Sequence, residues 1–353
     1  MRARVSLAPI RDFQYTFIKD RGARRADGAG RKVGGMARVS IVGGGNVGAN
    51  AAFFIAEKGV TDVLLVDIQP GLSRGKMLDI MEAAPIRRYR NTLSGSDSLE
   101  DIKGSQLVVI AAGAIRAPGM RREELLAVNA GLISDLAPKV ARLAPDSSVV
   151  IATEPVDSLT TIFARESGMP RTRVMGLGGI LDSTRLRALI ARELNLSMEV
   201  ISAMVIGRHS DDMICLPRYC SVSGVPLPFL LGQDRVTAIV EETRTSGDLL
   251  VELAKRSSSY YAPSAAVAEL ADSIHMNLNR IFSVSLLLTG EYGVRDGALS
   301  LPAMIGEKGI VRVLTPELTE EEKAVFMESA RRVPAAVRES APAAKGKAAG
   351  GTA

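Results

Sequence analysis

The chain has 353 residues, of which 46% are hydrophobic and 24% charged, so it should form about two domains with ample core. Its formal net charge of +5 is concentrated in residues 1–35, which hold nine Arg or Lys and three Asp. The rest is nearly neutral, which argues against a nucleic-acid partner. No apolar run approaches the ~18 residues of a membrane span, and two cysteines form no disulfide framework. A cytoplasmic location with no membrane partner is therefore expected.

Residues 1–35 show no sustained apolar period and are rich in Arg, Ala and Gly. Three interpretations stay open: a disordered basic extension, an organelle-targeting segment, or sequence upstream of the true start. Met36 stands directly before the first predicted strand, which favours the last interpretation, and three Asp are unusual in a targeting segment.

The run Ala37–Gly48 is a short apolar strand that leads into a glycine-rich turn, and Ala49–Glu57 has helical spacing. Gly43, Gly45 and Gly48 have the spacing G-x-G-x-x-G. The first glycine permits a tight turn, the second lets the backbone approach a pyrophosphate, and the third allows close packing of helix and strand. The predicted cofactor-binding residues of this turn are Gly43, Gly44, Gly45, Asn46, Val47 and Gly48.

A second apolar run, Val63–Val66, ends in Asp67. A carboxylate at this strand end accepts hydrogen bonds from a ribose diol and repels a 2′-phosphate. The strand before the glycines, the helix after them and the acid at this distance together predict NAD as the cofactor, in preference to NADP.

The alternation of strands and helices continues beyond this motif. Helical patterns at Leu72–Ala83 and Arg122–Leu143 alternate with apolar strands at Leu107–Ala112 and Ser148–Thr153. This alternation is typical of an α/β fold with a parallel sheet, in which ligands bind beyond the carboxyl ends of the strands. We therefore expect a Rossmann-type NAD-binding domain at residues 36–157.

The pattern changes in the second half of the chain. Helices are predicted at Asp182–Leu194, Gln233–Ser258, Ser264–Leu288 and Thr319–Arg332, a strand at Val200–Ile206, and short strands with turns at Asp296–Val313. This mixture predicts an α+β catalytic domain at residues 158–333. Residues 334–353 are an Ala, Gly, Lys and Pro low-complexity segment, which predicts a disordered tail.

The chain contains only two histidines, which narrows the search for an acid–base group. His209 follows a β-branched run and a glycine, at a strand end where catalytic groups tend to lie; an ordinary loop histidine is the alternative. His275 lies beside an apolar helical stripe and is expected to be structural. The two cysteines match no zinc-binding pattern, so no metal site is expected.

Two charged pairs supply further candidates. Asp182 and Arg185 are three residues apart at a predicted helix start, so they share a face. Beside a histidine, the aspartate would orient the imidazole and the arginine would bind a carboxylate. Arg116 and Arg122 flank a Pro-Gly loop after a strand, where they could close over an anionic substrate; an exposed basic loop is the alternative.

These motifs together resemble the lactate/malate dehydrogenase family from about Ala37 to about Val333. The resemblance rests on Val42-Gly-Gly-Gly-Asn-Val-Gly48, Asp67-Ile, Gly75-Lys-Met-Leu-Asp79, Ala112-Gly-Ala-Ile-Arg-Ala-Pro-Gly-Met-Arg-Arg122, Asn129-Ala, Leu181-Asp-Ser-Thr-Arg185, Gly207-Arg-His209 and Ser259-Tyr-Tyr-Ala-Pro263. The runs Arg116–Met120 and Leu216–Tyr219 are most similar to the lactate-dehydrogenase-like malate dehydrogenases. The resemblance implies a Rossmann domain followed by an α+β catalytic domain, assembled as a homodimer or homotetramer.

The resemblance also implies roles for individual residues. His209 would accept the proton of the substrate hydroxyl, and Asp182 would stabilise the imidazolium. Arg185 would bind the carboxylate beside the reacting carbon, while Arg122 would polarise the carbonyl. Arg116 would pair with a second carboxylate, so the implied substrate is a dicarboxylate and the implied reaction interconverts (S)-malate and oxaloacetate with NAD. Further implied residues are Ser259 in the substrate pocket and Gly113, Asn129, Ala152 and Thr153 at the cofactor.

One predicted substrate-binding position departs from the family, because Glu154 stands where the family has Asn. The asparagine amide donates to the substrate oxygen, whereas an ionised glutamate only accepts. At ~4 Å its charge would repel an anionic substrate by about 4 kcal/mol. A protonated Glu154 in a buried pocket would donate instead. Arg208 is expected to point away from His209 because side chains alternate along a strand.

Two other functions stay open beside malate oxidation. One is a lactate or other 2-hydroxyacid dehydrogenase. The other is an NAD-binding homologue whose catalysis Glu154 impairs.

Overall fold

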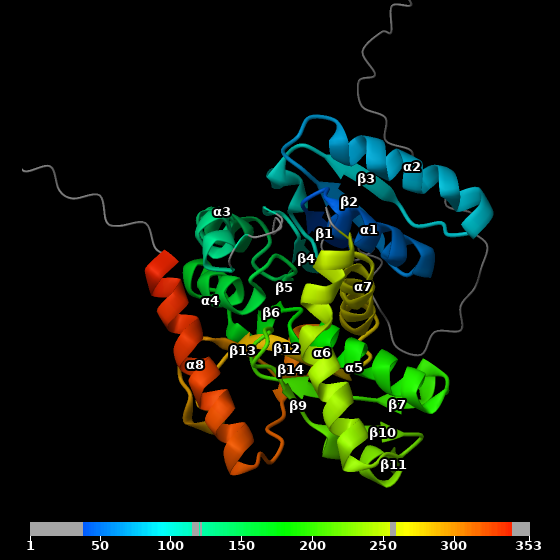
Figure 1. Ribbon diagram of the computed structural model, residues 1–353. Helices are drawn as coiled ribbons and strands as arrows, with labels where there is room; N and C mark the ends of the chain where they lie inside the picture. Colours follow the sequence, from blue (N-terminus) through cyan, green and yellow to red (C-terminus); the bar gives the residue numbers. More distant parts are fainter. Residues whose placement is uncertain (1–37, 115–119, 121, 255–258, 341–353) are drawn as a thin grey trace, which may run out of the picture.

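The computed structural model describes residues 38–114, 120, 122–254 and 259–340, so the expectations for residues 1–35 and 341–353 lie outside the described residues. Within these ranges nine strands form one sheet in the order β14-β13-β12-β6-β5-β4-β1-β2-β3. The strands from β6 to β3 are parallel, whereas β12, β13 and β14 are antiparallel. One sheet therefore runs through both halves of the chain (Figure 1).

The parallel strands confirm the expected α/β architecture. They are β1 (Arg38–Val42), β2 (Asp62–Val66), β3 (Leu93–Ser96), β4 (Leu107–Ile110), β5 (Ser148–Ile151) and β6 (Val174–Gly176). Strands β4 and β5 are buried along their whole length, as expected for parallel strands covered on both faces. Strands β3 and β6 were not predicted, because neither carries a long apolar run. The domain boundary at residue 157 stays a prediction, and β6 extends the parallel order beyond it.

Helices cover both faces of the sheet. Their bounds are α1 (Asn46–Lys58), α2 (Leu72–Arg87), α3 (Arg122–Leu143), α4 (Val156–Ser167), α5 (Gly179–Leu194), α6 (Gln233–Ala254), α7 (Tyr261–His275) and α8 (Glu320–Ser340). Figure 1 shows α3, α4 and α8 gathered on one side of the sheet and α1 and α7 on the other. Two cores match these layers: one contains Ile55 and Val267, and the other contains Ile133 and Phe163.

The second half of the chain adds a small third core. It lies among α5, α6 and strands of two small sheets, and it contains Ile190, Ile239 and both cysteines. The strands are β7 (Ile201–Ser202), β8 (Val205–Ile206), β9 (Ile214–Cys215), β10 (Ser221–Val222) and β11 (Val225–Pro226). The single strand predicted at Val200–Ile206 is therefore two strands, β7 and β8, which belong to different sheets.

The prediction of one helix over Ser264–Leu288 was wrong. Helix α7 ends at His275, and strands β12 (Arg280–Leu287), β13 (Ala298–Gly306) and β14 (Gly309–Val313) follow. Asn277 and Asn279 have φ of 51° and 54°, a left-handed conformation that ends the helix and turns the chain. The apolar run after them is buried between β6 and β13, where pairing in the sheet outweighs the helical period.

The prediction of a disordered tail was wrong for residues 334–340. Helix α8 continues to Ser340, and Pro334 lies inside the helix. Phe326 and Val333 are buried on its inner face, and Ala336 and Val337 pack against the core beneath α3 and α4. This apolar face, rather than the composition of the segment, explains why the helix extends so far.

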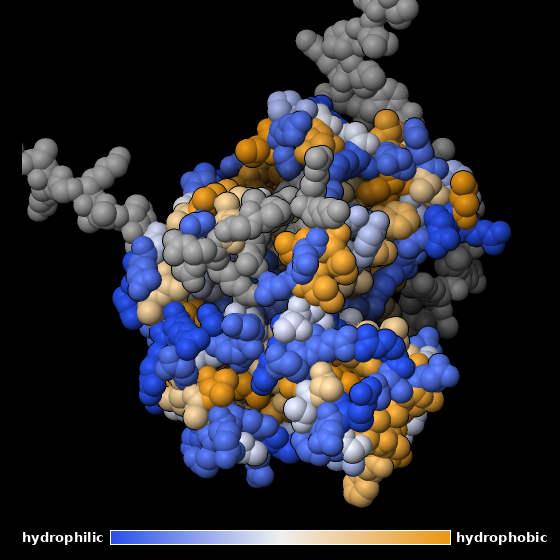
Figure 2. Space-filling view, in the orientation of Figure 1, coloured by the Kyte–Doolittle hydropathy of each residue, from blue (hydrophilic) through white to orange (hydrophobic). Residues whose placement is uncertain are grey.

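No helix among the described residues is both long enough and apolar enough to cross a membrane. Figure 2 shows hydrophilic and hydrophobic residues interspersed over the visible face.

The glycine turn gives a matched test of packing. A Cβ at Gly48 would lie 1.9 Å from the carbonyl oxygen of Gly43, whereas among the described residues nothing outside the adjoining backbone comes within 4 Å of a Cβ at Gly45. We expect Gly48→Ala to lower the free energy of unfolding by about 1–3 kcal/mol, because backbone must move. Gly45→Ala should leave it nearly unchanged. Denaturant unfolding of both variants measures this, and equal losses would contradict the account.

Candidate active site

The predicted ligand edge of the sheet carries a cavity. The glycine turn follows β1, Asp67 follows β2, and Ala152 and Thr153 follow β5. A cavity of about 200 Å³ opens beside these strand ends. Residues from both halves of the chain line it, among them Val47, Gly113, Ala152, Arg185, His209 and Ser259.

The glycine turn is held close to the strand ends. The N–H of Gly43 donates to the carbonyl of Val66 at 2.8 Å. Asp67 lies against the turn, because its carboxylate accepts from the N–H of Gly44 at 2.6 Å and from that of Gln69 at 2.8 Å. Gly45 precedes α1 without a capping side chain, so the first N–H groups of the helix suit a phosphate. Asp67 thus lies beside the turn, where its carboxylate could accept hydrogen bonds from the ribose diol of a bound dinucleotide.

Asn129 and Thr153 tie together the ends of β4 and β5. The Asn129 amide accepts from the N–H of Ala114 at 2.8 Å and donates to the carbonyl of Glu154 at 2.8 Å. The Thr153 hydroxyl donates to the carbonyl of Ala112 at 2.8 Å. A Cβ at Gly113 would lie 2.5 Å from Thr153, so this close packing requires glycine. Asn129 is buried and bonded to the backbone, and its predicted contact with the cofactor stays a prediction.

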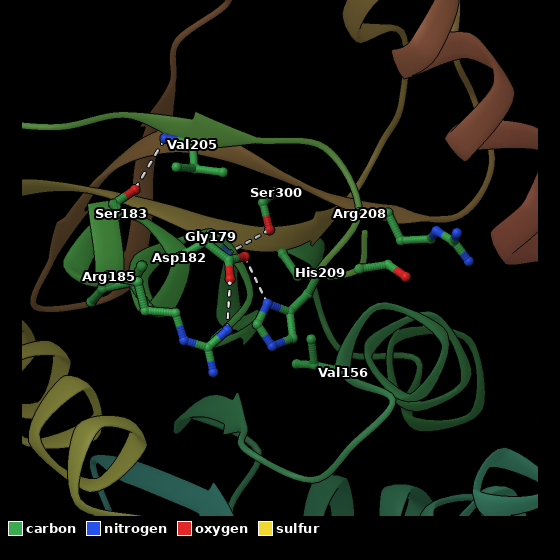
Figure 3. Close-up of polar contacts among 12 residues, drawn as sticks. Val156, Gly179, Asp182, Ser183, Arg185, Val205, Arg208, His209 and Ser300 are labelled. Carbon is green, nitrogen blue, oxygen red and sulfur yellow. Dashed lines mark hydrogen bonds and ion pairs between the residues drawn. The ribbon is translucent and has the colours of Figure 1, made fainter. Parts of the chain in front are cut away.

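His209 and Asp182 form the hydrogen-bonded pair that the sequence predicted. Nδ1 of His209 lies 2.6 Å from Oδ2 of Asp182, whose side chain is 1% exposed. Arg185, one turn further along α5, donates to Oδ1 of Asp182 at 3.3 Å. In Figure 3 the imidazole and the guanidinium lie side by side below Asp182. Because both residues line the cavity, an anion there could contact the two cationic groups together.

Asp157 fixes the backbone of His209. Its Oδ2 accepts from the N–H of His209 at 2.7 Å, and its Oδ1 accepts from the Ser285 hydroxyl at 2.6 Å. Burial raises the pKa of Asp157 to about 6, and the two hydrogen bonds counteract this effect in part. Asp157 stands three residues after Glu154 in the sequence, but this role depends on strand β12, which local patterns did not place beside it.

The charges around His209 favour its protonated form. Burial alone would lower the pKa of the imidazole, but the negative charges of Asp182 and Glu154 outweigh it and raise the pKa to about 9. The adjacent Arg185 opposes this change.

Glu154 faces the other ring nitrogen. Its Oε1 lies 3.4 Å from Nε2 of His209, and its Oε2 accepts from the N–H of Val156 at 3.0 Å. The side chain is 47% exposed, so the buried pocket that a protonated Glu154 would require is absent. Arg208 donates to Asp212 at 2.9 Å and points away from His209 (Figure 3), which confirms that it does not offset Glu154.

Of the remaining predicted residues, the structure places some at the cavity and others elsewhere. Ser259 lines the cavity. Arg116 lies outside the described residues, and Arg122 is described only as the first residue of α3, so their substrate contacts stay predictions. His275 ends α7 and lies 3.1 Å from the Gln106 amide oxygen, which confirms a structural position. The described residues contain no cluster of metal-ligating side chains.

Sequence reasoning missed the contribution of helix α6. Arg244, Gly247 and Asp248 line the cavity, although only the long helix was predicted. A Cβ at Gly247 would lie 3.4 Å from Nη1 of Arg185, so the missing side chain leaves room for the guanidinium. The packing of α6 against α5 brings these residues to the site, and no local motif signals it.

A glycine turn after β1, an acid after β2 and a His–Asp pair at the same edge of a parallel sheet define a dinucleotide-binding dehydrogenase fold. Residues 37–176 match the lactate/malate dehydrogenase NAD binding domain, and residues 180–341 match the alpha/beta C-terminal domain of the same proteins. The chain therefore belongs to the lactate/malate dehydrogenase family.

Relatives and solved structures agree with this assignment. The chain is 41% identical over 296 residues to the malate dehydrogenase of Thermomicrobium roseum, which covers 84% of this chain and 96% of the relative. The structure of the malate dehydrogenase from Aeropyrum pernix is 40% identical, with a TM-score of 0.82 over 85% of this chain and 97% of the other. The lactate dehydrogenase from Cryptosporidium parvum is 30% identical, with a TM-score of 0.83 over 88% of this chain and 99% of the other. That structure was solved with lactic acid and nicotinamide adenine dinucleotide.

Asp157 gives a test of how the site is held together. Asp157→Ala leaves the N–H of His209 and the Ser285 hydroxyl without their acceptor, which should lower the free energy of unfolding at pH 7 by about 1–3 kcal/mol. Asp157→Asn retains an acceptor oxygen and should lose much less.

A pH series adds a second readout. The pKa of Asp157 lies above its ordinary value in the folded protein, so its contribution to stability falls as pH rises from about 4 to about 6. The Asn variant should lack this fall. Equal losses in both variants, with an unchanged pH dependence, would contradict the role given to Asp157.

Proposed function

We propose that the chain is an NAD-dependent dehydrogenase that interconverts malate and oxaloacetate. The observation that carries this proposal is the His209–Asp182 pair, whose imidazole lines the same cavity as Arg185. The malate dehydrogenases among its relatives support malate over lactate as the substrate.

The residues present suit a dinucleotide. A bare helix start, a carboxylate beside it and the open backbone at Gly45 fit a pyrophosphate and a ribose diol. When bound, NAD or NADH accepts or supplies the hydride. The nearby Asp67 carboxylate would repel a 2′-phosphate, which favours NAD over NADP.

His209 moves the proton in this proposal. In oxaloacetate reduction, the imidazolium donates the Nε2 proton to the oxygen that becomes the malate hydroxyl, and in malate oxidation the neutral ring takes this proton back. Asp182 holds the ring through Nδ1, which leaves Nε2 directed at the cavity. The buried Asp182 carboxylate also stabilises the positive charge of the ring.

Arg185 is the candidate for the substrate carboxylate. Its guanidinium is held by Asp182 on one side and has room on the side of Gly247. A planar guanidinium binds a carboxylate through two parallel N–H bonds, which would fix the reacting carbon beside His209. The second carboxylate of malate is assigned to Arg116, on the sequence alone.

The oligomeric state and the cellular location stay predictions: a homodimer or homotetramer, and the cytoplasm.

A steady-state assay of NADH oxidation tests the proposal. Oxaloacetate should exceed pyruvate in kcat/KM by at least ~100-fold, because pyruvate would leave one arginine unmatched in the pocket. His209→Asn should abolish most of the activity, while retention of NADH binding by this variant controls for folding. Preference for pyruvate, or no turnover of oxaloacetate from about pH 5 to 9, would contradict the proposal.

A further inference from the structure

The imidazole of His209 lies between two carboxylates. Asp182 Oδ2 is 2.6 Å from Nδ1, and Glu154 Oε1 is 3.4 Å from Nε2. The side chains of His209 and Asp182 are 12% and 1% exposed, so water screens that contact weakly, whereas Glu154 is 47% exposed and its contact with Nε2 is screened more strongly. A neutral imidazole has one N–H, whereas an imidazolium donates from both nitrogens. Two flanking carboxylates therefore match the protonated ring.

The other charged groups near His209 do not replace this second carboxylate. Asp157 of α4 faces the backbone N–H of His209. Arg185 of α5 is the cation beside the pair, and its charge opposes protonation of the ring. Arg208 is held by Asp212, and from α6 Arg244 and Asp248 reach the same cavity.

Two hydrogen bonds hold Glu154 in its position. Oε2 accepts from the N–H of Val156, the first residue of α4, where the positive end of the helix dipole favours a carboxylate. The carbonyl of Glu154 accepts from the buried Asn129 amide. The carboxylate is therefore fixed at both the side chain and the backbone, with one oxygen left to face His209.

We propose that Glu154 is a second counter-ion of His209, which keeps the imidazole in its proton-donating form and adapts the site to carbonyl reduction at neutral pH. This inference rests on the proposed function for its direction of reaction, but not for the contact itself. It also bears on the repulsion expected from the sequence, because the imidazolium and the Arg185 guanidinium together balance the negative charges of Asp182 and Glu154.

The raised pKa of His209 sets the pH dependence expected for the two directions of the reaction. With the pKa of His209 raised to about 9, only ~1% of the ring is neutral at pH 7. Malate oxidation needs the neutral ring, so its rate should rise as pH increases through this pKa. Oxaloacetate reduction needs the protonated ring and should persist until pH passes the same pKa.

The first test measures His209 directly by NMR titration of its imidazole resonances. The chain has two histidines, so His275→Gln assigns the spectrum. The wild-type pKa should be near 9, and Glu154→Gln should lower it by about one to two units because an opposite charge is lost. Glu154→Asn is a second variant, and bound NADH confirms that each variant is folded.

The matched control is Glu166→Gln, which removes the same charge from an exposed position near the far end of α4. This variant should titrate like the wild type. If both Glu154 variants leave the pKa of His209 unchanged, the inference is overturned. Because the titration needs no substrate, it decides this even if oxaloacetate is not turned over.

The second test is kinetic. At saturating NAD, Glu154→Gln should raise kcat/KM for malate at pH 7 by about 10- to 50-fold and move the rising limb of the pH profile to lower pH. The alkaline limb of oxaloacetate reduction should move downward with it. A purely structural role would lower both rates without moving either limb, and that result would count against the inference.

Discussion

The hydrogen bond between His209 and Asp182 is the interaction on which the rest of the site depends. Asp182 is buried at the start of α5, and Arg185 lies one turn further along the same helix. A single helix therefore supplies both the carboxylate that contacts the imidazole and the guanidinium beside it. Asp157 of α4 holds the backbone of His209, and Ser285 of β12 holds Asp157. The proposed proton transfer therefore relies on the joining of the parallel and antiparallel parts of one sheet.

The sequence predicted those features that depend only on residues close together in the chain. The glycines required by a tight turn, the buried runs of β4 and β5 and the acid after β2 are each specified within a few residues. Strand β12 was not predicted, because its pairing with β13 outweighs a helical period. Asp157 was not assigned, because its partners lie 52 and 128 residues away.

The effect expected of Glu154 differs between the sequence and the structure. As an isolated substitution it places a negative charge beside an anionic substrate, which suggests an impaired enzyme. In the folded protein the carboxylate accepts from the first N–H of α4 and lies 3.4 Å from the imidazole of His209. Under our proposal the residue belongs to the proton-transfer group, and the sequence could not show this because it depends on the 3.4 Å approach of two loops.

The central claim is that a hydride passes between a nicotinamide and the carbon beside the proton handled by His209. Reduction of oxaloacetate with NADH that carries deuterium at both positions on C4 of its nicotinamide tests this most directly. The account predicts malate with one deuterium, bonded to C2 and located by NMR. Malate without deuterium at C2, or no malate at all, would contradict it.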